Sequence, residues 1–225
     1  MSENMKVIAK IYNGYTSKFG IPRQSGLAPV LSKIVFEPEY RVKDAFRGID
    51  GFSHLWLIWL FDKVIQKEWT PTVRPPKLGG NVRMGVFATR SPFRPNSMGL
   101  SSVKLVGVEF DEKLGPVLVV EGADLMDGTP ILDVKPYLPY TDCHADATGG
   151  FALQDTVGQK VEIPDSLCRN LDERTLLEIR HILAQDPRPS YHDDKDRVYG
   201  FEYSGLEVKF TADGQRFTVV SIEKK

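Results

Sequence analysis

Leu55-Trp56-Leu57-Ile58-Trp59-Leu60-Phe61 is the longest apolar run in the chain, and it decides the fold class. Side chains alternate between the two faces of a strand, so this run presents apolar side chains on both faces. A strand of that kind is buried on both sides, which predicts a central position in a sheet. The run is far shorter than the roughly 20 residues that a bilayer-spanning helix needs, so we expect no membrane span.

Short β-prone stretches flank this run on both sides, separated by Gly, Pro or Asp turns. One or two helical turns are expected at residues 41–47, ending at Gly48. The other expected strands cover residues 7–12, 32–36, 84–89, 101–110, 117–120 and 131–137. Many short strands without regular helices between them favour a barrel-like β domain over a doubly wound sheet.

The sequence changes character after about residue 142. Residues 143–150 are small and polar, as in a linker, and residues 171–183 have the periodicity of an amphipathic helix. Three strands with hairpin turns are then expected at residues 197–203, 206–210 and 217–222. The sequence therefore predicts a mainly β protein, with a β-barrel domain at residues 1–145 and a small α+β domain at residues 146–225.

The composition is that of a globular protein. The 225 residues are 41% hydrophobic and 10% aromatic, which excludes disorder as the main state. The polar start of the chain lacks the apolar stretch of a secretory signal. The two cysteines, Cys143 and Cys168, are too few for a disulfide scaffold or a Cys-rich zinc site. We therefore expect a cytoplasmic protein.

Charge is distributed unevenly along the chain. Residues 69–108 contain six cationic side chains and no acidic one, while the whole chain has a net charge of −1. Such segregation favours a local anion-binding surface. The alternative is a loop-rich region whose cations are simply solvated.

Residues 90–101, Arg90-Ser91-Pro92-Phe93-Arg94-Pro95-Asn96-Ser97-Met98-Gly99-Leu100-Ser101, form the most unusual segment. Two prolines stiffen the backbone, and Arg90 and Arg94 can each bind a carboxylate or phosphate through two hydrogen bonds. Asn96 and Gly99 tolerate dihedral angles that turn backbone groups toward a ligand. The segment fits a small anionic ligand, or a rigid connection whose arginines pair with acidic neighbours.

A second polar segment covers residues 127–137. Asp127-Gly128-Thr129-Pro130 is a turn that exposes carbonyls and a carboxylate. Strand alternation then places Asp133, Lys135 and Tyr137 on one face. That face is either a polar site or the solvated side of an edge strand.

Histidines give no support for metal catalysis. His54, just before the apolar run, is more often a packed residue than a catalyst at such a position. His144, His181 and His192 lack the spacing of metal ligands. Sequence signatures of serine hydrolases, dinucleotide-binding folds and P-loops are also absent, so we expect no metal and none of these chemistries.

Asp186-Pro187-Arg188-Pro189-Ser190-Tyr191 follows the expected helix. The prolines present the Arg188 guanidinium on an extended backbone, with Tyr191 nearby as a stacking plane. The alternative is an ordinary helix stop followed by a loop.

Together these segments resemble the TsaA-like (YaeB, TrmO) family of S-adenosyl-L-methionine-dependent tRNA methyltransferases over nearly the full length. One departure is Ser97, where the family usually has proline after the asparagine. The resemblance rests on residues 21–24, 51–56, 74–80, 85–91, 93–96, 127–130, 133–137 and 186–191.

The resemblance implies methylation of N6 of threonylcarbamoyladenosine at tRNA position 37, beside the anticodon. It also implies a homodimer that holds its cofactor, S-adenosyl-L-methionine, near the subunit interface. The donor pocket would then be formed by Pro22, Arg23, Gln24, His54, Leu55, Arg90, Leu100, Asp127, Gly128, Thr129 and Pro130.

We assign roles from the chemistry of these residues. Asp133, Lys135 and Tyr137 would form the catalytic face, with Asp133 or Tyr137 as proton acceptor. The anticodon loop of tRNA would be bound by Arg74, Lys77, Arg94, Asn96, Arg188 and Tyr191. Two other readings stay open: a non-catalytic module that binds the donor or RNA, and a small-molecule methyltransferase.

Overall fold

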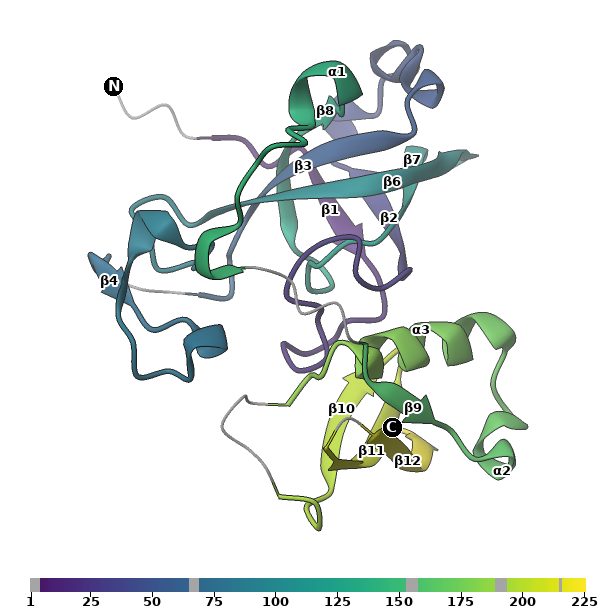
Figure 1. Cartoon of the computed structure of the whole chain (residues 1–225). Coiled ribbons are helices and arrows are strands. Elements are labelled where there is room, and N and C mark those ends of the chain that lie inside the picture. The colour runs from purple at the N-terminus through teal and green to yellow at the C-terminus, as the bar shows by residue number, and fades with distance from the viewer. Residues whose placement is uncertain (1–4, 65–68, 153–157, 189–193, 215) are drawn as a thin grey trace.

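The computed structural model describes residues 5–64, 69–152, 158–188, 194–214 and 216–225, and it is mainly β, as predicted. Six antiparallel strands pair in the order β1-β2-β7-β6-β3-β8, and β8 returns to β1, so the sheet is a closed barrel (Figure 1). Closure leaves no unpaired strand edge in this sheet. The strands are β1 (Ala9–Tyr12), β2 (Leu31–Phe36), β3 (His54–Leu60), β6 (Met98–Asp111), β7 (Gly115–Glu121) and β8 (Pro130–Pro136).

The apolar run forms β3 and pairs with a strand on each side, β6 and β8. Leu55, Leu57 and Trp59 point into the barrel and are buried, as alternation requires. Trp56 and Ile58 lie on the outer face and are half-buried. The predicted central strand is therefore confirmed.

The position of the Trp59 ring explains why β6, the neighbouring strand, has glycine at position 99. Gly99 pairs with Trp59 across the β3–β6 ladder, and a Cβ added to Gly99 would overlap the indole ring. A side chain at this position would displace the ring or the strand, because protein interiors are close-packed.

Short 3-10 helices connect β2 to β3: η1 (Pro38–Tyr40), η2 (Lys43–Phe46) and η3 (Ile49–Gly51). They confirm the helical turns expected around residues 41–47. Phe46 of η2 packs edge-on against Phe36 of β2, with ring centroids 4.8 Å apart, and so anchors this connection to the barrel core.

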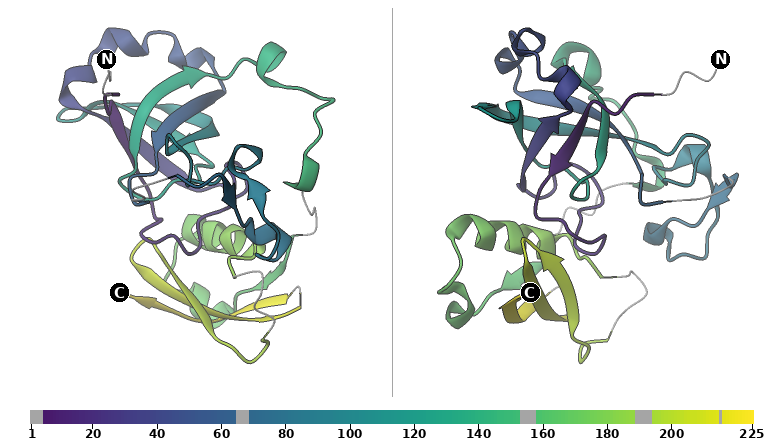
Figure 2. Two further views of the ribbon diagram at one scale, coloured as in Figure 1. Left: turned by 90° about the vertical axis from the view of Figure 1, so that its left-hand side faces the viewer. Right: turned by 180° about the vertical axis from the view of Figure 1, so that it is seen from behind.

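Residues 69–97, which we call the basic extension, leave the barrel after β3 and return to it at β6 (Figure 1). The right-hand view of Figure 2, from behind, also shows this segment projecting beside the barrel. It contains a two-stranded ladder and two 3-10 helices: β4 (Thr72–Val73), η4 (Pro76–Leu78), β5 (Met84–Gly85) and η5 (Val86–Ala88). The strand expected at residues 84–89 is wrong beyond Gly85, because the Thr89 amide turns back to the Val86 carbonyl.

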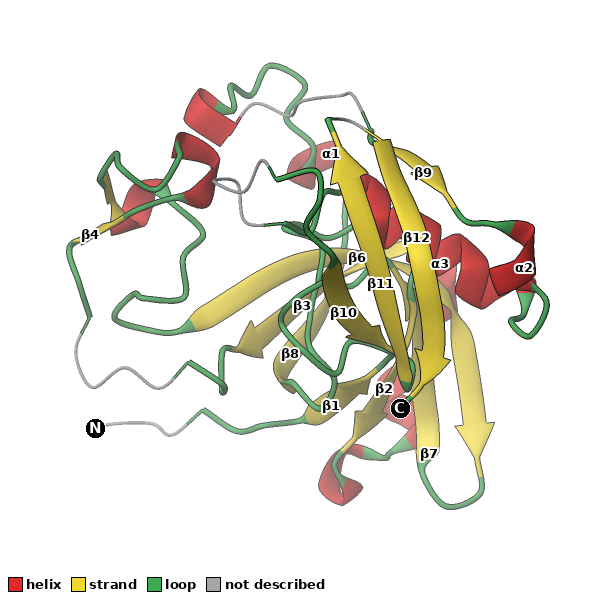
Figure 3. Ribbon diagram, turned by 90° about the horizontal axis from the view of Figure 1, so that it is seen from below, coloured by secondary structure: helices red, strands yellow, loops and turns green. Residues whose placement is uncertain are grey.

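Beyond the barrel the chain forms a four-stranded sheet with helices (Figure 3). The predicted meander and helix are confirmed as β10 (Tyr199–Tyr203), β11 (Leu206–Asp213), β12 (Arg216–Lys224) and α3 (Glu173–Ala184). Asp172 caps α3 by accepting a 2.9 Å hydrogen bond from the Thr175 amide. The sequence did not predict β9 (Lys160–Glu162), which pairs in parallel with β12. The remaining short elements are α1 (Pro139–Asp142), η6 (Gly150–Ala152) and α2 (Asp165–Cys168).

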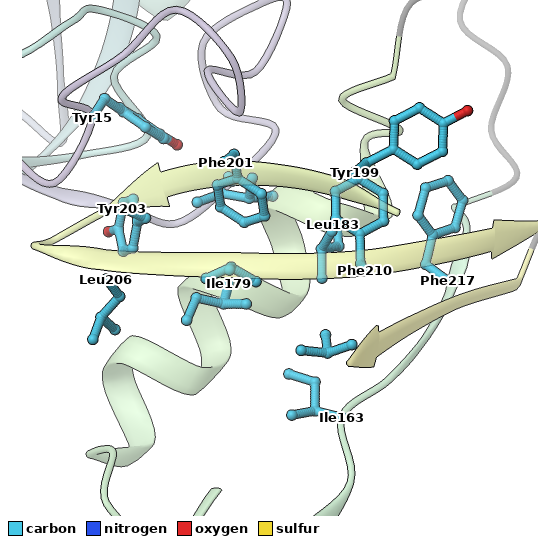
Figure 4. Close-up of a cluster of buried hydrophobic side chains, with 14 of the residues drawn as sticks. Tyr15, Ile163, Ile179, Leu183, Tyr199, Phe201, Tyr203, Leu206, Phe210 and Phe217 are labelled. Atoms are coloured by element: carbon cyan, nitrogen blue, oxygen red, sulfur yellow. The ribbon is translucent and has the colours of Figure 1, made fainter. Parts of the chain in front are cut away.

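The hydrophobic core of this second unit includes residues from the N-terminal part of the chain. Tyr15, Ala28 and Val30 belong to the same cluster as Phe201 and Phe210, and Figure 4 shows Tyr15 beside Tyr203. The segment between β1 and β2 therefore packs on the C-terminal sheet. Because residues 22–24 lie in this segment, the second unit helps to position them.

A buried carboxylate joins the two units. Glu178 of α3 accepts hydrogen bonds from the Leu31 amide (3.1 Å) and the Tyr203 hydroxyl (2.7 Å). The Arg174 guanidinium also donates to Glu178 and to Glu121 of β7. These contacts satisfy Glu178 inside the protein and fix α3 against the barrel.

Candidate active site

The end of the barrel where β3 ends and β8 begins, which we call the barrel mouth, contains a polar chain. The Trp59 indole donates to the Ser101 hydroxyl at 3.0 Å, and this hydroxyl donates to Asp124 Oδ1 at 2.5 Å. Burial raises the pKa of Asp124, while the Ser101 hydrogen bond and the Arg90 charge oppose the shift. A half-buried carboxylate with a raised pKa is a frequent feature of functional sites.

Arg90 and Gln24 meet at the barrel mouth. The Arg90 guanidinium donates a hydrogen bond to Gln24 Oε1, although 66 positions separate the two residues. Their proximity agrees with the predicted donor pocket. Next to Gln24 in the chain, Arg23 is exposed, whereas Pro22 is buried.

The predicted turn at residues 127–130 is attached to the end of β1. Asp127 Oδ1 accepts a 3.0 Å hydrogen bond from the Asn13 amide, and the Gly128 amide donates to the Ile11 carbonyl. Gly128 has φ of 76°, a conformation that favours glycine. Asp127 therefore helps to hold the turn, and Asn13 is a supporting residue of the turn that the sequence reasoning missed.

At the opposite end of the barrel, which we call the far end, aromatic side chains gather around His54. The Tyr137 ring lies 6.1 Å from His54 and 5.5 Å from Trp56, measured between centroids. The Trp56 indole donates to Asp142 Oδ2 at 2.7 Å and so links β3 to α1. His54 is exposed and contacts the Ser53 hydroxyl at 3.0 Å. His54 is therefore not a buried packing residue, although such a role is the more usual one for a histidine at this position.

Asp133 and Lys135 lie on the outer face of the barrel and form an ion pair of 3.2 Å. Asp133 pairs with Ile58 in the β-ladder, and Ile58 pairs with Leu100 on its other side, so all three side chains share this face. Leu100 is 56% exposed. The sheet therefore places Asp133 and Leu100 on the same face, with Ile58 of β3 between them.

Leu55 requires a correction. Its side chain points into the barrel and is fully buried, because it occupies an inward position of β3. It cannot contact a ligand on the outer face, so only the Leu55 backbone remains as a donor contact.

The predicted donor-binding residues fall into two groups along β3. His54 begins this seven-residue strand and Leu60 ends it at the barrel mouth. At roughly 3.3 Å per residue, these ends lie about 20 Å apart along the strand. Within one chain, the barrel mouth and the far end therefore do not form one compact pocket.

The residues predicted to contact tRNA differ in their surroundings. Arg74 and Asn96 are exposed, whereas Arg94 donates to the Thr89 carbonyl at 3.0 Å and braces its own loop. Ser97, the departure from the family pattern, donates to the Pro92 carbonyl at 3.0 Å and closes the same loop. Lys77 lies in η4, with a side chain outside the description, and Tyr191 lies outside the described residues.

Arg188 also requires a correction. Its side chain is only 10% exposed and forms a two-point ion pair with Asp186 at 2.9 and 3.0 Å. Its guanidinium also lies 4.8 Å from the Phe217 ring centroid. The expected presentation of this guanidinium to RNA is therefore wrong, since Arg188 orders its own loop.

Within the described ranges, no cluster of three or more His, Cys, Asp or Glu side chains could hold a metal ion. The same part of the chain contains no helix that is long and apolar enough to cross a bilayer.

The barrel and the second unit match two protein-family models. Residues 10–143 match the tRNA-methyltransferase O N-terminal domain, and residues 159–225 match the TrmO C-terminal domain. These matches define a chain with both domains of the tRNA-methyltransferase O class. The chain belongs to the TrmO family.

Individual relatives agree with this assignment. A tRNA (adenine(37)-N6)-methyltransferase of Escherichia coli is 38% identical over 97% of each chain. One of the same name from Eikenella corrodens is 48% identical over 71% of this chain and 90% of its own length. A protein of Archaeoglobus fulgidus described as S-adenosyl-L-methionine-binding is 32% identical over 62% of this chain and 92% of its own. The crystal structure of TrmO from Pseudomonas aeruginosa superposes with a TM-score of 0.81 at 32% identity, covering 100% of this chain and 98% of that one.

Proposed function

We propose that this protein is an S-adenosyl-L-methionine-dependent tRNA methyltransferase that modifies N6 of threonylcarbamoyladenosine at position 37. The observation that carries this proposal is membership of the TrmO family over both of its domains, with relatives named tRNA (adenine(37)-N6)-methyltransferase. A non-catalytic binding module and a small-molecule methyltransferase are less favoured, because neither accounts for these relatives.

The side chains present fit the methyl donor. When bound, S-adenosyl-L-methionine supplies an electrophilic methyl group on a positively charged sulfur. Arg90 would bind the donor carboxylate, and the exposed Leu100 would pack against the purine. The carboxylates of Asp124 and Asp127 would favour the positive sulfur. Pro22, Arg23, Gln24 and residues 128–130 complete the proposed pocket at the barrel mouth.

The proposed enzyme is a homodimer. The separation of the barrel mouth from the far end supports this assembly, because a second copy would supply the group that is too distant within one chain. In a two-fold dimer, the His54 end of each copy meets the Arg90 end of its partner, which forms two equivalent sites.

Asp133 is the proton acceptor in our proposal. The exocyclic amine of adenine must lose a proton as its nitrogen bonds to the methyl carbon, so a base has to lie within reach. Partial desolvation raises the pKa of Tyr137, with Cys143 and Asp142 acting in the same direction. Tyr137 thus stays protonated at neutral pH and acts as a hydrogen-bond donor, while Lys135 orients Asp133 through their ion pair.

We place the domain boundary between residues 145 and 146. The two hydrophobic clusters and the gap between the two matched family models support this division, although residues 13–30 pack on the second unit. The cytoplasm is the proposed compartment, a reducing environment that fits two free cysteines.

Mass spectrometry of nucleosides tests the proposed function. The purified protein is incubated with threonylcarbamoylated tRNA and S-adenosyl-L-methionine, and the tRNA is then digested. We expect one added methyl group on the threonylcarbamoyladenosine nucleoside, and a single-turnover rate about 100-fold lower for Asp133→Asn. Donor binding without transfer would indicate a binding module, and transfer to free nucleosides but not to tRNA would indicate a small-molecule enzyme.

A further inference from the structure

The basic extension carries two exposed aromatic rings that the donor pocket does not use. Trp69 is 48% exposed and Phe87 is 73% exposed. Their rings stack with centroids 6.1 Å apart and an interplanar angle of 24°. Large apolar side chains gathered on a surface mark a site of interaction.

The backbone around these rings is braced. Thr72 and Gly85 pair in the β4–β5 ladder, and the Val86 amide donates to the Pro71 carbonyl at 2.9 Å. The Arg83 guanidinium donates to the Thr72 hydroxyl, also at 2.9 Å. Trp69 and Phe87 flank this ladder in the sequence, so their stacked arrangement is held by the fold.

Along the basic extension itself, the charged side chains are all cationic. No acidic residue occurs in residues 69–108. Among the described residues, no ion pair involves Arg74, Arg83, Arg90 or Arg94. Guanidiniums without a carboxylate partner, on the same segment as exposed aromatic rings, are complementary to a nucleic acid, in which phosphates alternate with flat bases.

The position of the basic extension in the fold indicates which nucleic acid would contact it. It connects the end of β3 to the start of β6, so it leaves the barrel at the mouth, and Arg90 lies on its returning arm. An RNA whose modified base reaches the donor pocket would pass next to these rings.

We propose that Trp69 and Phe87 form a stacking platform for an unpaired base of the tRNA anticodon loop, adjacent to the base that is methylated. Arg74 and Arg83 bind phosphates on either side of the stacked base. This inference rests on the proposed function and adds the part of the substrate that the extension recognises. Stacking on an aromatic ring tolerates different bases, so the platform provides affinity with little sequence preference.

Binding of a synthetic anticodon stem-loop RNA tests the platform. For the full-length Trp69→Ala/Phe87→Ala variant, we expect an affinity at least about fivefold weaker. A fivefold change is about the smallest effect that loss of one base–aromatic stack usually has. The KM for the methyl donor should not change. The dependence of affinity on salt should also stay the same, because no phosphate contact is lost, whereas Arg74→Ala/Arg83→Ala should reduce it.

Two controls separate stacking from other effects. Phe110, 61% exposed on β6 near the β6–β7 turn, is the matched control, and Phe110→Ala should bind RNA like the wild type. Trp69→Phe keeps a stacking ring, so it should retain most of the affinity but lose most of the tryptophan quenching that RNA causes in the wild type.

The inference is overturned if the double alanine variant binds the stem-loop as tightly as the wild type does. It is also overturned if the double alanine variant loses affinity and sedimentation shows it to be a monomer where the wild type is a dimer. The rings would then contact a second copy of the chain and not the RNA. Failure of the wild type to methylate tRNA would instead contradict the proposed function.

Discussion

The barrel mouth and the far end lie at opposite ends of β3, and they offer different chemistry. The barrel mouth combines the Arg90 guanidinium with the half-buried carboxylate of Asp124. The far end presents the rings of His54, Trp56 and Tyr137 around an exposed surface. The mouth offers charged groups and the far end offers flat ones. In the proposed dimer, a donor with both kinds of group would be bound by the mouth of one copy and the far end of the other.

The two ends also differ in the pKa of a carboxylate, Asp124 at the barrel mouth and Asp142 at the far end. Burial raises the pKa of Asp124, whereas hydrogen bonds from the Leu138 amide and the Trp56 indole lower the pKa of Asp142. Asp142 is stabilised as an anion and holds α1 on β3. Asp124 is held in surroundings that disfavour its charge. The surroundings of Asp142 serve a structural role, while a perturbed pKa such as that of Asp124 is more typical of a functional site.

Replacement of Arg90 should have the largest effect, because it removes the guanidinium that meets Gln24 at the barrel mouth. For Arg90→Ala, we expect kcat/KM for the methyl donor to fall about 100-fold through loss of charge-assisted hydrogen bonds. The thermal midpoint should change little, since the side chain is exposed. Arg47→Ala removes a guanidinium from a fully surface ion pair and should leave kcat/KM unchanged. Equal activity of the Arg90 and Arg47 variants would remove Arg90 from the donor pocket.

A methyl group added at Gly99 tests how rigid the barrel mouth is. Gly99→Ala places a Cβ against the Trp59 ring and should lower the free energy of unfolding by about 1–3 kcal/mol, the usual cost of overpacking. It should also disturb the hydrogen bond from Trp59 to Ser101. Urea denaturation measures the change, and Gly51→Ala, which meets open space near the far end, is the control. Similar stability of both variants would mean that the Trp59 contact does not constrain the mouth.

The two carboxylates should change stability with pH in opposite directions. A raised folded pKa means that Asp124 binds its proton more tightly when folded, so its contribution decreases as pH rises from the usual carboxyl pKa through the raised value. Asp142 has a lowered folded pKa, so its contribution is present above the usual value and is lost as pH falls through the folded pKa.

Denaturation of Asp124→Asn and Asp142→Asn between pH 3 and 7 measures these contributions (a range of about one to three units around the usual carboxyl pKa). Relative to the wild type, Asp124→Asn should gain stability as pH rises, and Asp142→Asn should lose it. Parallel curves for the two variants would contradict the contrast between the two ends.

Ser97 should give the smallest effect. Ser97→Ala removes one hydrogen bond to the Pro92 carbonyl, which is worth about 1 kcal/mol or less in a half-exposed loop. Activity should stay within about twofold, because no charged group is lost. A larger loss of activity, measured in the methylation assay, would show that this loop positions Arg90 more directly than its contacts indicate.

The sequence predicted the parts of this molecule that depend on local patterns. Apolar residues on both faces identified β3, and alternation placed Asp133 and Lys135 on one outer face. The family resemblance brought Arg90 and Gln24 together, which no local pattern could do.

Contacts between distant residues account for what the sequence did not predict. Ser101 and Asp124 are ordinary polar residues 23 positions apart, and they become partners because the β6–β7 pairing continues past Lys104 and Glu121. The burial of Arg188 depends on Phe217, which arrives from another strand, so a stiff Pro-flanked segment was mistaken for an exposed one. The strand expected at residues 84–89 ended early because a backbone turn at Val86 was not visible in the side-chain pattern.

Subunit complementation tests most directly whether one donor site combines the mouth of one copy with the far end of another. His54→Ala damages only the far end and Arg90→Ala only the mouth, so each variant alone should be nearly inactive. After mixing and exchange of subunits, half of the dimers are mixed and each contains one intact site, which predicts about one quarter of wild-type methylation. A mixture no more active than its components would contradict the shared site.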